Sequence, residues 1–171
     1  MNKNARVLVA VVVAALAIFA MLKFMPQSDE KLIAKQFTQI ADNLDKFGQE
    51  SLLKIATRAE KLKGLLADPC SFDAKQIDEI GMLNGEHSAS EAAKNLIGLR
   101  EQCARLKLRF ENMEIKVASK PVAYVNVDAV ISGSAKSGEA LNERLKLRCT
   151  LLKENGKWLF SRCEIEFSDY E

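Results

Sequence analysis

Four cysteines and one histidine are the side chains of this sequence that first suggest chemistry. The cysteines are Cys70, Cys103, Cys149 and Cys163. They lie far apart in the chain and include no Cys-x-x-Cys pair, so their spacing is not that of a zinc site. His87 lies in the polar segment "NGEHS", ahead of a predicted helix, and we expect it to be exposed to solvent. The sequence therefore predicts no metal site and no cofactor.

Acid–base catalysis needs a carboxylate, histidine or tyrosine in an apolar pocket, where burial can tune its pKa. Tyr124 and Asp128 fall on the polar side of a predicted strand, and Asp42 and Glu60 fall on the polar faces of predicted helices. The sequence also has no glycine-rich phosphate loop and no Gly-x-Ser-x-Gly turn. We therefore predict no catalytic residue.

The charge balance argues against binding to nucleic acid. The 171 residues include 25 Lys and Arg against 23 Asp and Glu, for a net charge of +2. Three of the basic residues, Lys3, Arg6 and Lys23, flank an apolar run near the N-terminus. Without them the chain has about one more acid than bases. Such a near-neutral domain lacks the basic surface that nucleic acid needs.

The N-terminal segment "MNKNARVLVAVVVAALAIFAMLKFM" predicts a membrane anchor. Residues 7–25 are long enough to cross a bilayer, because Lys23 can extend to the interface. The alternative is a signal peptide cleaved after Ala15 and Ala17, which would leave an apolar N-terminus. We expect residues 1–27 to be an anchor and exit linker in the bacterial inner membrane, with the N-terminus in the cytoplasm. Residues 28–171 would then form a domain in the periplasm or outside the cell.

Three helices are predicted after the anchor, because apolar residues recur at helical spacing. Ser28 can cap the first helix, Pro69 ends the second, and Ser88 with Glu91 forms a capping box for the third. The three apolar stripes are Ile33, Phe37, Ile40, Leu44 and Phe47; Leu52, Ile55, Ala59, Leu62 and Leu66; and Ala92, Leu96, Leu99 and Cys103.

After Ala104 the apolar residues alternate, which predicts four antiparallel strands with one apolar face. Phase slips at Glu111–Asn112 and at Ser161–Arg162 predict β-bulges. Asn155–Gly156 is a strong signal for a two-residue hairpin turn between the last two strands. The pattern of helices followed by strands predicts an α+β fold.

The hairpin turn and its bulge place Cys149 directly opposite Cys163 on the inward face. This geometry is compatible with a disulfide and equally with two buried free thiols. If the disulfide forms, Cys70 and Cys103 would pair by elimination, as an extracytoplasmic location permits. The same register pairs Arg148 with Glu164 on the outer face.

The order of these features resembles the nuclear transport factor 2-like superfamily, of the SnoaL-like, cystatin-like kind. The resemblance covers roughly residues 30–168 and is clearest in "SASEAAKNLIGL" and "LLKENGKWLFSRCEIEF". It implies three helices packed on a curved sheet of four or slightly more antiparallel strands, which form a cone. It also implies a homodimer through the sheet and room for a small apolar ligand. Members include isomerases, dehydratases and anchored secretion-system subunits, so the fold does not fix the function.

We expect a non-catalytic, membrane-anchored envelope domain that binds a small apolar ligand or a protein partner. The alternatives are an assembly subunit of an envelope complex, and a small lyase or isomerase with its active site in the cone. The predicted pocket lining is Phe37, Phe72, Phe110, Met113 and Trp158.

Overall fold

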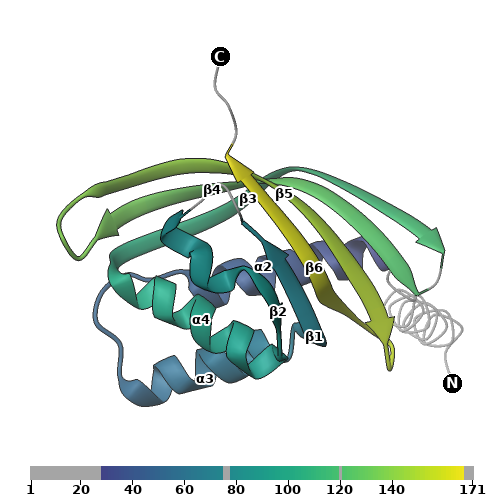
Figure 1. The fold of residues 1–171 in the computed structure, drawn as a ribbon, viewed down its shortest axis with the longest axis horizontal. Helices are drawn as coiled ribbons and strands as arrows, with labels where there is room; N and C mark the ends of the chain where they lie inside the picture. The colour runs from purple at the N-terminus through teal and green to yellow at the C-terminus, as the bar shows by residue number, and fades with distance from the viewer. Residues whose placement is uncertain (1–27, 75–77, 120, 168–171) are drawn as a thin grey trace, which may run out of the picture.

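The computed structural model describes residues 28–74, 78–119 and 121–167, which form an α+β, cone-like fold. Three α-helices lie under one face of a curved six-stranded mixed sheet (Figure 1). The predicted anchor, residues 7–25, lies outside the described residues. None of the helices in the described ranges has the length and apolar character needed to cross a membrane.

The first and third helices begin at the predicted caps, whereas the cap of the second helix, Ser51, was not predicted. The helices are α2 (Asp29–Leu44), α3 (Leu52–Lys63) and α4 (Ala89–Gln102), with a short 3-10 helix, η1 (Asp78–Leu83), before α4. The side chain of Ser28 accepts a hydrogen bond from the first turn of α2, and Ser51 does the same for α3. Ser88 and Glu91 form the predicted capping box at the start of α4. Local polar side chains thus fix where each helix starts.

Three stripe residues predicted for the first two helices lie outside the buried helix faces. α2 ends at Leu44, and Phe47 lies beyond it with 75% of its surface exposed. Leu52 opens α3 but is 85% exposed. α3 ends at Lys63, and Leu66 is the first residue of a strand. Just before it, the carbonyl of Leu65 accepts a hydrogen bond from the backbone N–H of Phe160, which belongs to the sheet. Pairing with the sheet therefore replaces the last predicted helical turn.

The sheet contains the four predicted strands and two more. Its strands are β1 (Leu66–Asp73), β2 (Gly85–His87), β3 (Cys103–Ser119), β4 (Val122–Ala135), β5 (Ala140–Glu154) and β6 (Lys157–Phe167). In space they follow the order β2-β1-β6-β5-β4-β3. β1 runs parallel to β6, and the other neighbours are antiparallel. The prediction of an antiparallel sheet of four or slightly more strands is therefore corrected to a six-stranded mixed sheet.

The predicted register of the last two strands is confirmed. Cys149 pairs with Cys163, and the register shifts at the predicted bulge, between Phe160 and Arg162. Asn155 and Gly156 have φ angles of 48° and 80°, as a type I′ turn requires. The other predicted bulge lies on β3 beside Asn112, whose φ is 53°.

The core lies between α2 and the concave face of the sheet. Ile33 and Phe37 of α2 are fully or almost fully buried there. The Phe37 ring meets Phe110 of β3 and Phe160 of β6 edge-on, with centroid distances of 5.1 and 4.8 Å. Aromatic pairs in this geometry add to the stabilisation by burial. These contacts hold one face of α2 against the sheet. The opposite face of α2 points away from the sheet.

Candidate functional site

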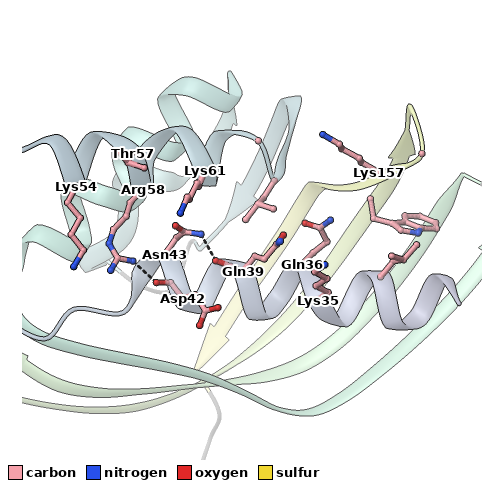
Figure 2. Close-up of a pocket in the computed structure, with 15 residues that line it drawn as sticks. Lys35, Gln36, Gln39, Asp42, Asn43, Lys54, Thr57, Arg58, Lys61 and Lys157 are labelled. Atoms are coloured by element: carbon pink, nitrogen blue, oxygen red, sulfur yellow. Dashed lines mark hydrogen bonds between the residues drawn. The ribbon is translucent and has the colours of Figure 1, made fainter. Parts of the chain in front are cut away.

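A groove of about 700 Å³ lies between α2, α3 and the turn that joins β5 to β6 (Figure 2). Its floor and one wall come from the outward face of α2, its second wall comes from α3, and Lys157 stands at one end. The lining residues are Leu32, Lys35, Gln36, Gln39, Asp42, Asn43, Lys54, Thr57, Arg58, Lys61, Gly64, Leu65, Gly156, Lys157 and Trp158. The groove is open, most of its lining residues are polar or charged, and it lies outside the apolar core.

Positive charge dominates this groove: five lining side chains are cationic and one is a carboxylate. Two of the cations are neutralised by Glu50, which lies 2.8 Å from Lys54 and 3.1 Å from Arg58. The other three are Lys35, Lys61 and Lys157, which we call the groove lysines. Within the described part of the chain, no carboxylate lies within ion-pair distance of them.

Side-chain amides line the groove along α2. Gln36, Gln39 and Asn43 follow one another at helical spacing, and Asn43 Nδ2 donates to the carbonyl of Gln39 at 2.7 Å. Two lining atoms are buried without a hydrogen-bond partner among the described residues: the Oε1 acceptor of Gln36 and the Nε–H donor of Arg58. Buried polar atoms are normally paired, so this acceptor and this donor are unsatisfied at the wall of the groove, and a ligand would pair with them once the two side chains turn toward it.

A cluster of buried charges holds the loop between α2 and α3 behind this groove. The guanidinium of Arg100 is fully buried and donates to the carbonyls of Leu44 and Asp45, at 3.1 and 2.8 Å. It also lies 2.5 Å from Glu50 and 2.6 Å from Glu101. We call Asp45, Lys46, Glu50, Arg100 and Glu101 the buried charge cluster.

Glu50 links this cluster to the groove. Burial raises the pKa of its carboxyl, but hydrogen bonds from Lys54, Arg100 and Arg58 outweigh burial and lower that pKa to about 2. Glu50 is therefore ionised at neutral pH, and it fixes Lys54 and Arg58 at the edge of the groove.

The five residues predicted to line an apolar pocket lie in the hydrophobic core. Phe37 and Trp158 are each 1% exposed, and Phe72, Phe110 and Met113 are partly buried against the same cluster. Of these, Trp158 also borders the groove. These side chains therefore pack between α2 and the sheet. The groove lies elsewhere, and most of its lining residues are polar or charged.

The four cysteines are free thiols in this structure. The predicted pairing of Cys70 with Cys103 is wrong, because they lie near opposite ends of α4, a helix about 21 Å long. Cys149 and Cys163 do lie opposite one another, both buried, and a hydrogen bond between them together with burial raises the pKa of Cys149. Their oxidation to a disulfide stays a prediction.

The residues considered for acid–base chemistry are not brought together. His87 lies on β2, with Nε2 2.9 Å from the carbonyl of Leu83. Tyr124 is 52% exposed on the outer face, where Asp128 accepts hydrogen bonds from Asn112 and Arg144. In the described ranges, no group of His, Cys, Asp and Glu has the arrangement of a metal site.

The groove was not predicted from the sequence, although a signal is present. Lys54, Arg58 and Lys61 recur at helical spacing on α3, as Lys35 and Gln39 do on α2. Such polar faces are usually solvated, so spacing alone does not indicate that two of them face each other across a hollow.

No protein-family model matches the chain, and no curated protein matches its sequence. Its fold is similar to that of several solved proteins. One is hexachlorocyclohexane dehydrochlorinase from Novosphingobium barchaimii, with 12% identity, a TM-score of 0.63 and coverage of 83% of this chain and 88% of that one. Another is a protein proposed to be a scytalone dehydratase from Novosphingobium aromaticivorans, with 19% identity, a TM-score of 0.60 and coverage of 84% and 88%.

A third similar structure is a protein of unknown function with a cystatin-like fold from Nostoc punctiforme. It has 14% identity and a TM-score of 0.60, over 84% of this chain and 96% of that one. These likenesses show that the chain shares the α+β, cone-like fold of these solved proteins over more than four-fifths of its length. At identities of 12–19% these likenesses establish the fold only, and the function has to be argued from the residues of the site.

Proposed function

We propose that this chain is a non-catalytic binding domain that holds an anionic partner in the groove between α2 and α3. The observation that carries the proposal is the set of three groove lysines without compensating carboxylates. Cations that are held close together around a hollow raise its positive potential, which an anionic ligand would relieve. The amides beside them offer hydrogen bonds that would orient such a ligand.

The apolar interior supports this choice over a small apolar ligand. Phe37, Phe110 and Phe160 are packed edge to face where a cone-filling ligand would lie. A ligand there would have to displace close-packed side chains, at a cost of several kcal/mol, about that of removing a large core residue. The groove needs no such displacement.

Membrane attachment belongs to the same proposal. Residues 7–25 would anchor the chain in the bacterial inner membrane, and residues 28–171 would form the domain outside the cytoplasm. An anchored domain with a binding groove suits the role of an assembly subunit in an envelope complex. The homodimer through the sheet stays a prediction.

Lysine footprinting tests the proposed function at the level of single residues. The full-length chain in detergent is acetylated with and without tripolyphosphate, a compact polyanion, and the modification of each lysine is measured by mass spectrometry. We expect protection of Lys35, Lys61 and Lys157. The internal controls are Lys116, Lys136 and Lys146, which are exposed away from the groove. Equal protection of both sets would contradict the proposal.

A small lyase or isomerase is the second candidate, because a dehydrochlorinase and a protein proposed to be a dehydratase share the fold. Such chemistry needs a base inside an apolar cavity. In the described ranges the buried carboxylates are those of Asp45 and Glu50, and both are engaged: Asp45 accepts hydrogen bonds from Leu108 N–H and the Lys107 ammonium, and Glu50 is paired with Arg100, Lys54 and Arg58. We therefore expect no turnover of hexachlorocyclohexane or scytalone by the full-length chain, and measurable turnover would favour this second candidate.

A further inference from the structure

We propose that the ligand of the groove is an acidic segment of a polypeptide in extended conformation. This inference rests on the proposed function and names the class of anion. It draws on three features of the groove: its unpaired hydrogen-bonding atoms, its length, and the placement of its cations on opposite walls.

The unpaired atoms match the two polar groups of a peptide bond. Gln36 Oε1 lacks a donor, and Arg58 Nε–H lacks an acceptor. An extended peptide presents backbone N–H and C=O groups in regular alternation, so one segment can supply both partners. A fully ionised phosphate or a carboxylate offers acceptors but no donor to Gln36.

The length of the groove suits a short extended segment. Its lining along α2 runs from Leu32 to Asn43, which corresponds to about 16 Å of helix. At about 3.3 Å per residue, an extended peptide of about five residues spans that distance. Gln36, Gln39 and Asn43 lie along this path and can hydrogen-bond to successive peptide groups.

The groove lysines are placed for side chains that alternate in direction. Lys35 belongs to α2 and Lys61 to α3, while Lys157 extends from the β5–β6 turn over the space above α2 (Figure 2). Successive side chains of an extended peptide point to opposite sides. Consecutive Asp or Glu residues would therefore direct carboxylates to both walls of the groove.

An anionic glycan is the main alternative, and the lining favours it less. Aromatic rings that bind ligands offer an open apolar face. Trp158, the aromatic residue of this lining, is 1% exposed, and its Nε1 already donates to Asp29 at 3.1 Å. The groove thus offers amides and ammonium groups, which suit a peptide backbone with acidic side chains.

Four probes separate these alternatives when binding to the full-length chain in detergent is measured by calorimetry. They are a terminally blocked pentaglutamate, the same peptide with N-methylated internal amides, a galacturonate oligosaccharide of similar length, and tripolyphosphate. We expect pentaglutamate to bind at least tenfold more tightly than the other three. N-methylation removes the backbone donors and keeps the charge, and it is applied to the ligand, so the protein fold is unaffected.

Two sets of variants locate the binding. Replacing the three groove lysines by glutamine should weaken pentaglutamate binding at least tenfold, whereas Lys116→Gln, Lys136→Gln and Lys146→Gln together, with the same change in net charge, should not. Gln36→Leu should weaken pentaglutamate about fivefold, as expected for one lost hydrogen bond, and leave tripolyphosphate unchanged.

The outcomes distinguish this inference from the proposed function. If the oligosaccharide or the N-methylated peptide binds as tightly as pentaglutamate, the peptide inference is overturned and the anion-binding groove stands. If no probe binds, or if the control lysines matter as much as the groove lysines, both proposals are overturned.

Discussion

Two groups of charges lie on either side of the loop that joins α2 to α3, and they are organised in opposite ways. In the buried charge cluster every side chain has an ion-pair or hydrogen-bond partner: Arg100 contacts two carboxylates and two carbonyls, and Lys46 lies 2.9 Å from Glu101. The groove lysines are exposed and have no carboxylate within ion-pair distance among the described residues. Charges in the first group hold the fold, whereas those in the second are available to a ligand.

Glu50 contacts both the buried charge cluster and the edge of the groove, and its contacts explain why the charges of the cluster are paired and the groove lysines are not. Its two oxygens are occupied by Arg100 on the buried side and by Lys54 and Arg58 on the groove side. Its single charge is shared among three cations and leaves the groove lysines unneutralised. The comparison predicts that substitutions in the buried charge cluster change stability strongly, and that substitutions of groove lysines change binding with little effect on stability.

Arg100→Met should have the largest effect. It leaves Glu50 and Glu101 without their buried partner and removes the donors to two loop carbonyls. Removing one partner of a buried ion pair costs about 3–5 kcal/mol of unfolding free energy, measurable by urea denaturation. Arg148→Met is the matched control, because Arg148 also contacts two carboxylates but is 57% exposed. We expect the control to lose at most about 1 kcal/mol; equal losses would contradict the comparison.

The sequence predicted the sheet more completely than the loop and the groove. Local rules fix the sheet, since Asn155–Gly156 sets the turn and the alternation on each side sets the partners, down to Cys149 opposite Cys163. β1 was missed because its parallel pairing with β6 joins segments about ninety residues apart, and no local pattern encodes such a partner.

The buried charge cluster could not be predicted for a similar reason. Arg100 and Glu50 are fifty residues apart, and an arginine on an amphipathic helix is usually exposed. The buried face of α4 includes Ala93, Ile97 and Arg100, about one residue out of phase with the predicted stripe. The groove depends in turn on this packing, because the ionic contacts of Glu50 tie the start of α3 to α4, and Arg58 of α3 donates to the Asp42 carbonyl of α2 at 2.5 Å.

Acidification should affect stability next most strongly. The pKa of Glu50 is about 2 in the folded protein, below the ordinary glutamate value of 4.5, so its ionised form stabilises the fold above pH 4.5. That contribution, at most about 3 kcal/mol, is lost as the pH falls from 4.5 to 2. In urea denaturation across this range, Glu50→Gln should lack the corresponding part of the pH dependence.

Glu60→Gln is the control for that experiment, because the Glu60 carboxylate is 75% exposed and its ion-pair partner Lys63 lies 3.8 Å away. Its pH dependence should follow that of the unsubstituted chain. If Glu50→Gln does so as well, Glu50 does not stabilise the fold through its charge, and the link between the two regions is absent.

A matched pair of lysine substitutions sharpens the comparison further. Lys46 is 4% exposed and donates to Glu101 at 2.9 Å, so Lys46→Gln should cost about 2 kcal/mol, as for other hydrogen bonds to charged groups. Glu101 keeps its contact with Arg100 in this variant, so the loss should be smaller than for Arg100→Met. Urea denaturation of all three proteins checks this order.

Lys35→Gln is the same substitution in the groove, and its effect on stability should be the smallest and of opposite sign. Lys35 lies one helical turn after Lys31, and like charges at this spacing destabilise a helix by a few tenths of a kcal/mol. Glutamine keeps nearly the same helix propensity. We therefore expect stabilisation of at most about 0.5 kcal/mol at low salt, decreasing toward zero at about 0.5 M salt as screening increases. A salt-independent loss comparable to that of Lys46→Gln would mean that the groove charges also hold the fold, and the distinction between the two regions would fail.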